Sequence, residues 1–245
     1  MFYSRLNYIR VFGKYKLSLQ LKEKDIEITI DGRGKRRRYY RKVGEEEEEK
    51  YIYAENGEIV ICPVEPVNLP KEGTAEHLLI ELEKSIIIEP NVKDSFYVKF
   101  PIEIGVFLID KTDVERIDIF TRVKPKYILY GSPESGIICR WWKSNVYNDV
   151  PEVDRTYEGV MKVDIKNSYK EWVEIKKLVF RAFDMKIFYD GYAYMHSQVE
   201  ILKKLMGETS FIKRRPKGMK ESIDIYLAKG IKRFEKKFVM EWGFK

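Results

Sequence analysis

The feature that most constrains this chain is an alternation of apolar and polar residues with a period of two. In the stretch SFYVKFPIEIGVFLI (95–109) every even position is apolar, whereas the odd positions include Lys99, Pro101 and Glu103. Side chains alternate between the two faces of a β-strand, so the pattern predicts a strand with one buried face. Because proline cannot donate a hydrogen bond to a neighbouring strand, Pro101 predicts a sheet edge or a bulge.

The same period recurs in MKVDIKN (161–167), WVEIKKLVF (172–180) and FEKKFVMEWGF (234–244). Short turn-forming stretches such as ENGE, EPNVKD and YDGY separate the alternating segments, a spacing typical of antiparallel sandwiches. We therefore expect an all-β, mainly antiparallel fold, built as two β-sandwich-like domains or as one large sandwich.

One segment predicts a helix. In SQVEILKKLMGE (197–208), Ser197 and Glu200 have the spacing of a capping box, and Gly207 would end the helix. The fold should therefore contain at most one short helix, near residues 198–206.

The best internal boundary is the loop GSPESG, at Gly131–Gly136. It divides the chain into halves of sandwich-domain size. We expect an N-terminal β domain over residues 1–130, and over residues 131–245 a C-terminal β-sandwich-like domain with a basic C-terminal region.

A basic run lies directly against an acidic one in DGRGKRRRYYRKVGEEEEEK (31–50). The DG pair after an alternating segment favours a hairpin in which RRRYYRKV is the returning strand, with Tyr39 and Val43 on one face. The glutamate block would then form a flexible acidic loop. A binding element and a disordered arm are the alternatives.

The net charge of +7 comes from the C-terminal part of the chain, where residues 201–245 carry 13 Lys and Arg against 5 Asp and Glu. Within FIKRRPKGMK (211–220), cations cluster around a Pro/Gly turn, and such a turn can bind phosphate oxygens or an acidic protein surface. The candidate binding residues are Lys213, Arg214, Arg215 and Lys217. Solubility alone is the alternative explanation.

A second candidate patch lies in KYILYGSPESGIICRWWKSNVY (126–147). In a strand Trp141 and Trp142 point to opposite faces, and Arg140 shares a face with Trp142. Arg140 and Trp142 could stack on a planar or anionic ligand. The alternative is one tryptophan in the core and one packed between domains.

Standard catalytic motifs are missing from the sequence, including GxSxG, the phosphate-binding P-loop and HExxH. The weak candidate for a catalytic acid is Glu103, near Glu89, Asp110 and Asp118, although a solvated strand face explains all four residues. With two scattered histidines, we expect no metal and no cofactor. Cys62 and Cys139 are expected to be buried thiols, with one disulfide as the alternative.

Charged residues make up 35% of the chain, a Lys- and Glu-rich balance that favours a thermophilic source. No segment has the length and apolarity of a signal-peptide core or a membrane span, so we expect a cytoplasmic protein that does not insert into membranes.

Three stretches, FYVKFPIEIGVFLID, KYILYGSPESGIICRWWKS and KKFVMEWGF, resemble an archaeal family described as domain of unknown function 432. The resemblance covers nearly the whole chain and implies an archaeal source. It carries no catalytic residue over to this sequence.

These observations favour a non-enzymatic binding or scaffold module whose partner is a protein or an anionic molecule. The alternative is a hydrolase-like enzyme that uses acidic residues in a cleft between β domains. Sequence-specific nucleic-acid recognition is a third hypothesis, with less support because no known reading module is present.

Overall fold

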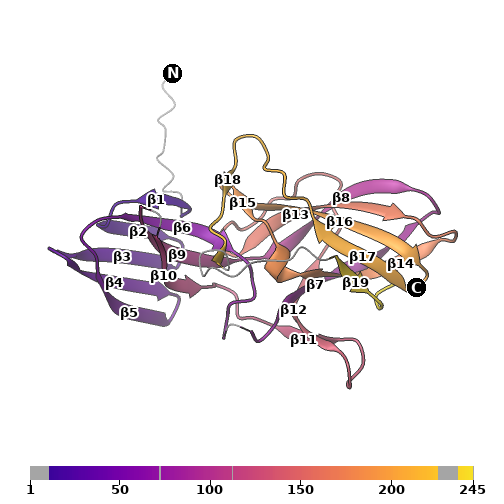
Figure 1. Ribbon diagram of the computed structural model, residues 1–245, viewed down its shortest axis with the longest axis horizontal. Helices are drawn as coiled ribbons and strands as arrows, with labels where there is room; N and C mark the ends of the chain where they lie inside the picture. The colour runs from indigo at the N-terminus through magenta and orange to yellow at the C-terminus, as the bar shows by residue number, and fades with distance from the viewer. Residues whose placement is uncertain (1–10, 72, 112, 226–236, 245) are drawn as a thin grey trace. The chain divides into compact units, whose positions relative to one another are not determined.

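The computed structural model describes residues 11–71, 73–111, 113–225 and 237–244. In this part of the chain nearly all regular structure is β-strand, and the strands form four sheets (Figure 1). The three-residue 3-10 helix η1, Ala182–Asp184, is a short exception. The all-β prediction is therefore confirmed. No helix among these residues is long and apolar enough to cross a membrane.

The described residues divide into two compact units whose segments interleave along the chain. The first unit comprises the described residues up to Cys62 together with Gly105–Asp118. The second comprises Pro63–Ile104 together with the described residues from Ile119 onward. Each unit is therefore assembled from segments that are distant in sequence.

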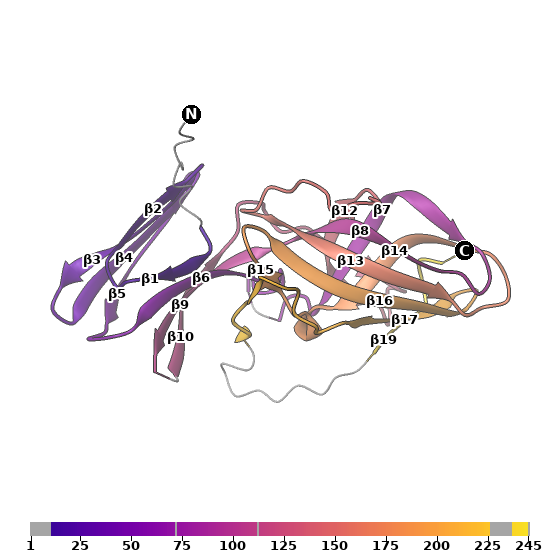
Figure 2. The same cartoon turned by 90° about the horizontal axis from the view of Figure 1, so that it is seen from above.

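The first unit contains a four-stranded antiparallel meander, the β2–β5 sheet (Figure 2). Its strands are β2 (Leu19–Glu23), β3 (Ile26–Arg33), β4 (Arg36–Val43) and β5 (Glu46–Tyr53). A second sheet has the order β1-β6-β9-β10. Its strands are β1 (Gly13–Tyr15), β6 (Glu58–Val64), β9 (Glu103–Asp110) and β10 (Asp113–Phe120).

The basic and acidic runs of the sequence are adjacent strands of the β2–β5 sheet. RRRYYRKV forms β4, with Tyr39 and Val43 both buried, as predicted. The acidic loop expected after it is wrong, because the glutamates form β5, which pairs with β4 along its whole length. Ion pairs between the two strands explain the difference: Lys42 Nζ lies 2.7 Å from Glu47, and Arg38 Nη2 lies 2.8 Å from Glu49.

A buried carboxylate connects β4 with β10. Asp118 accepts hydrogen bonds from the Tyr39 hydroxyl at 2.8 Å and from Arg41 Nε at 2.7 Å. All three residues are buried, and burial, followed by the charge of Asp118, raises the pKa of Tyr39. Arg41 and Asp118 therefore form an ion pair with little access to water.

The second unit contains a four-stranded sheet and a seven-stranded sheet. The first has the order β11 (Tyr127–Tyr130), β12 (Ile137–Ser144), β7 (His77–Ile88), β14 (Val173–Arg181). The main path of the second is β18 (Lys220–Glu221), β15 (Phe188–Tyr189), β16 (Ala193–Lys203), β13 (Glu158–Asn167), β8 (Lys93–Pro101). Off this path, β17 (Met206–Phe211) pairs with β16 and with β19 (Phe238–Met240). The loop Gly131–Gly136 joins β11 to β12 inside this unit.

The two sheets of the second unit are linked at both sides. Isolated bridges join Tyr97 to Tyr147 and Ile175 to Phe244. Buried Thr209 of β17 donates a hydrogen bond from its hydroxyl to the Val179 carbonyl of β14 at 2.7 Å. Most pairs are antiparallel, but β12 runs parallel to β7 and β13 runs parallel to β16. Strands that alternate inward and outward thus surround one core in this unit.

The alternating run at 95–109 forms two strands, because β8 ends at Pro101 and β9 begins at Glu103. β8 is the terminal strand of its path in the seven-stranded sheet. The edge position predicted from Pro101 is therefore confirmed, and the run passes from one sheet into another.

The helix expected near residues 198–206 is not formed. These residues belong to β16, a tight turn and β17, which pair as an antiparallel hairpin. Met195, Ser197, Val199 and Ile201 are buried at alternate positions of β16. Pairing with β13 on one side and β17 on the other overrides the local helical signal.

Both cysteines are buried thiols, and they do not form a disulfide with each other. Burial raises the pKa of the Cys139 thiol to about 12, so this thiol stays protonated and unreactive near neutral pH. The expectation of two buried thiols is confirmed.

Replacing Asp118 by alanine should strongly destabilise the first unit, because it leaves Arg41 as a buried cation without its carboxylate. Breaking a buried ion pair costs about 3–5 kcal/mol. Hydrogen exchange of the β4 and β10 backbone amides, measured at increasing urea concentrations, should show the lower free energy of unfolding.

The matched control is Glu49→Ala, which breaks the exposed ion pair with Arg38. That change should cost no more than about 1 kcal/mol. Equal losses in the two variants would contradict the structural importance of Asp118.

Candidate functional site

The outer face of the seven-stranded sheet is polar because its strands alternate. In β13, Val163 and Ile165 are buried, whereas Asp164 and Lys166 point to the other face. β8, β16 and β17 alternate in the same way. Since these strands are neighbours, their outward side chains form one continuous surface.

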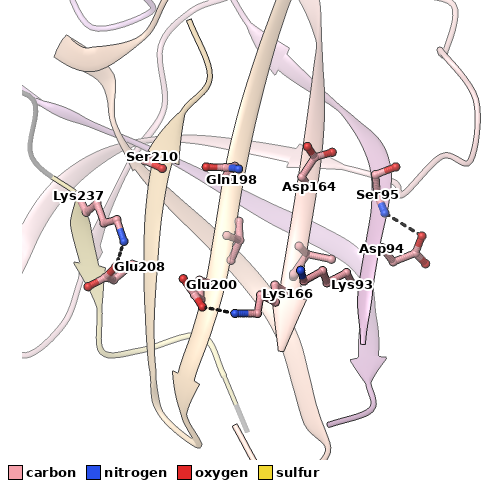
Figure 3. Close-up of a pocket in the computed structure, with 12 residues that line it drawn as sticks. Lys93, Asp94, Ser95, Asp164, Lys166, Gln198, Glu200, Glu208, Ser210 and Lys237 are labelled. Atoms are coloured by element: carbon pink, nitrogen blue, oxygen red, sulfur yellow. Dashed lines mark hydrogen bonds and ion pairs between the residues drawn. The ribbon is translucent and has the colours of Figure 1, made fainter. Parts of the chain in front are cut away.

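A groove of about 560 Å³ lies on this surface, across β8, β13, β16 and β17 (Figure 3). The following polar residues are among those that line it: Lys93, Asp94, Ser95, Asp164, Lys166, Gln198, Glu200, Glu208, Ser210 and Lys237. Two ion pairs cross the groove floor, Lys166 to Glu200 at 2.8 Å and Lys237 to Glu208 at 2.6 Å. The hydrogen bond from Lys166 lowers the pKa of Glu200. With three lysines and four acids, the groove is nearly charge-balanced.

Histidine and tyrosine side chains continue this face along the strands. His196 Nε2 lies 2.8 Å from Asp164 Oδ2, so the imidazole is held by a carboxylate that also lines the groove. Burial, together with nearby Tyr97, raises the pKa of Tyr194 to about 12. The sequence places His196 beside a helix cap, whereas the structure places it on the outer face of β16.

A smaller pocket of about 280 Å³ adjoins the groove, and Ser210 and Lys237 line both. We call it the edge pocket, because β19 pairs only with Gly207–Thr209 and leaves the end of β17 uncovered by that strand. Its lining is Arg181, Asp184, Thr209, Ser210, Phe211, Lys213 and Lys237. Three cations therefore surround it with one carboxylate.

The basic loop, residues 212–219, connects β17 to β18 (Figure 1). Its four candidate binding residues are all exposed, so a ligand in solution can reach them: Lys213, Arg214, Arg215 and Lys217. Lys213 also lines the edge pocket, so the loop and the pocket form one basic region.

Arg140 does not form an exposed patch with Trp142. Arg140 is 1% exposed and donates from Nη1 to the Lys126 carbonyl at 3.3 Å. Trp142 is partly buried, and its ring lies 6.5 Å from that of Tyr157. The Arg140 side chain is buried in the second unit, where its charge interacts with that of Glu103, so it is not open to a ligand in this structure.

Glu103 is fully buried, contrary to the solvated strand face that its sequence position suggests. Its carboxylate accepts hydrogen bonds from the backbone amides of Asn68 at 3.1 Å and Leu69 at 3.3 Å. Burial raises the pKa of Glu103 to about 8, and the hydrogen bonds and the charge of Arg140 oppose that shift only in part. Glu103 lines neither the groove nor the edge pocket.

Sequence reasoning finds the basic loop but misses Arg181 and Lys237. Arg181 lies at the end of a strand, and Lys237 lies 24 positions after Lys213 in the chain. No local motif connects these residues. Only the pairing of β17 and the position of β14 bring them to one pocket.

The raised pKa of Glu103 predicts a pH-dependent stability. Its carboxyl has an ordinary pKa near 4.5 in the unfolded chain and about 8 in the folded protein, so folding favours the protonated form. The resulting stabilisation is complete below about pH 4.5 and is lost as the pH rises to 8. Glu103→Gln mimics the protonated group and should remove this part of the pH dependence.

Urea unfolding at pH 5 and about pH 8 measures the effect in both proteins. The unmodified chain should lose several kcal/mol of stability between the two conditions, since each pKa unit corresponds to about 1.4 kcal/mol. If the free energy of unfolding depends on pH as strongly in Glu103→Gln as in the unmodified chain, groups other than Glu103 cause that dependence.

In the described part of the chain, no group of three or more His, Cys, Asp or Glu side chains could hold a metal ion. No curated protein and no solved structure matches this chain. The family model described as "Protein of unknown function (DUF432)" matches residues 11–241, which is nearly the whole sequence. The chain therefore belongs to the DUF432 family.

Proposed function

We propose that this protein is a non-enzymatic binding module that holds an anionic ligand in the edge pocket and on the basic loop. The observation that carries the proposal is the convergence of Arg181, Lys213 and Lys237, from three separate segments, on one pocket of about 280 Å³. The three cations repel one another, and a bound anion would reduce that repulsion.

The chemistry of the pocket suits phosphate or carboxylate oxygens. A guanidinium and two ammonium groups supply charged hydrogen-bond donors, and Ser210 adds a hydroxyl. Glu208 neutralises part of the charge of Lys237, and Asp184 lies 4.0 Å from Arg181, so the pocket is only moderately basic. One anionic group would therefore fit the pocket better than several.

The exposed part of the basic loop extends this region. Arg214, Arg215 and Lys217 follow Lys213 within four positions of the sequence and are all exposed. Cations on a loop can adapt to successive charges of a flexible polyanion, and their attraction falls as salt screens it. A ligand with several phosphate groups would use the pocket and the loop together.

The hydrolase alternative has less support. Its candidate acid, Glu103, is fully buried and borders neither the groove nor the edge pocket, so a substrate would not reach it there. A raised pKa suits a general acid only where the group can contact the reacting atoms.

Isothermal titration with inorganic tripolyphosphate tests the anion-binding proposal. Binding should weaken by more than about tenfold between roughly 50 mM and 200 mM salt, because several cations contribute. The variant Lys213→Glu, Arg214→Glu, Arg215→Glu, Lys217→Glu should bind too weakly to detect. Arg181→Gln alone should weaken binding severalfold, since it removes one pocket donor.

The matched control makes the same change in net charge at exposed lysines elsewhere in the second unit. It is Lys84→Glu, Lys143→Glu, Lys170→Glu, Lys204→Glu. Affinity that falls equally in both quadruple variants would reduce the proposal to a general effect of net charge. Absence of binding at low salt would overturn it.

A further inference from the structure

The β2–β5 sheet has an outer face on which arginine and tyrosine side chains meet. Tyr39 and Arg41 of β4 point to the buried side, so Arg36, Arg38 and Tyr40 occupy the other face. In β5 the residues directly opposite are Tyr53, Tyr51 and Glu49. Strand pairing therefore places two tyrosines beside two arginines that are more than ten positions earlier in the chain.

Charge is distributed unevenly along this face. Towards the β4–β5 turn, Lys42 pairs with Glu47 and Arg38 pairs with Glu49, so the cations there have carboxylate partners. Towards the β3–β4 turn, Lys35 pairs with Glu55. Asp31 lies opposite Arg38 on β3 and adds one further acid to the face.

Arg33 and Arg36 remain as the unneutralised cations of this end. They lie opposite each other across the β3–β4 hairpin, and both are exposed. Neither forms an ion pair with a carboxylate in the part of the chain that the structure describes. Two like charges held side by side repel each other, and a bound anion would remove that cost.

The tyrosines at this end are unusually open to solvent. Tyr51 is 52% exposed and Tyr53 is 73% exposed, although both lie in a regular strand. The Arg36 guanidinium lies over the Tyr51 ring, 4.1 Å from its centroid. The two rings are two positions apart on one strand, which spaces them by about 7 Å along it.

We propose that this face, the Arg–Tyr platform formed by Arg33, Arg36, Tyr51 and Tyr53, binds single-stranded nucleic acid. The Tyr53 ring and the part of the Tyr51 ring that Arg36 does not cover offer stacking surfaces for unpaired bases, and the two arginines offer donors to the phosphates beside them. Exposed aromatic rings next to unneutralised arginines match both parts of a nucleotide. An acidic protein surface would satisfy the arginines but would leave the rings without a stacking partner.

The platform lies in the first unit, whereas the edge pocket and the basic loop lie in the second. The two proposals use different residues and can fail separately. Tripolyphosphate has no bases, so its binding should not depend on Tyr51 and Tyr53.

Fluorescence anisotropy of a labelled single-stranded oligo(dT), compared with a duplex of the same length, tests the platform. Tyr51→Ala with Tyr53→Ala should weaken single-strand binding by about tenfold or more for each ring removed. Tyr51→Phe with Tyr53→Phe keeps both rings and should bind like the unmodified protein. Arg33→Gln with Arg36→Gln should weaken binding and reduce its dependence on salt.

Trp172→Ala is the matched control, because it removes an aromatic side chain that is 59% exposed in the second unit. It should leave oligonucleotide affinity unchanged. The tyrosine substitutions can be repeated in the quadruple variant that lacks the four loop cations. Tyr51→Ala with Tyr53→Ala should reduce single-strand affinity by the same factor in that variant as in the unmodified protein.

Three results would overturn the proposal. They are single-strand affinity that is unchanged in the alanine variant, duplex binding that is as tight as single-strand binding, and no oligonucleotide binding at low salt. Circular dichroism of the alanine variant checks that the sheet is intact. We expect it to be intact, because substitutions at exposed positions such as Tyr53 remove little packing.

Discussion

Alternation of side chains along paired strands is the constraint on which the rest of this structure depends. β13 shows it most clearly, because it is paired on both sides, with β8 and with β16. One face of β13 must fill the core, so the opposite face is left to polar residues such as Asp164 and Lys166. The groove follows from the same requirement in four neighbouring strands, and the outer face of the β2–β5 sheet arises in the same way.

Much of the fold could be predicted from this period, and the failures have physical causes. Strands β8, β13 and β14 lie where the alternation indicates them. The segment near 198–206 carries capping and spacing signals of a helix, but β13 and β17 on either side provide hydrogen bonds that no local signal reveals. The glutamate block looks like a solvated loop because its partners, Arg38 and Lys42, precede it in the chain.

The candidate sites were predictable only where their residues are contiguous. The basic loop is visible as a run of cations, whereas Arg181 and Lys237 reach the edge pocket through the order of strands. Arg140 and Glu103 show the opposite error, since each looks solvent-facing in sequence and each is buried. Burial raises the pKa of Glu103 and lowers that of Arg140, and the attraction between the two groups opposes both shifts only in part. A sequence without known contacts cannot show that these two residues are buried near each other.

The two basic runs of this chain show why a count of charges does not describe a surface. RRRYYRKV and FIKRRPKGMK are similarly rich in cations, but the first lies in a strand beside a glutamate-rich partner and the second lies in a loop. Register decides which cations of the strand are neutralised: glutamates lie near Arg38 and Lys42, whereas tyrosines lie near Arg36. The acidic block therefore cancels the charge at one end of β4 only. At the other end, the same pairing places aromatic rings beside Arg36, which has no carboxylate partner among the described residues, and a linear distance of fifteen residues becomes a direct contact with Tyr51.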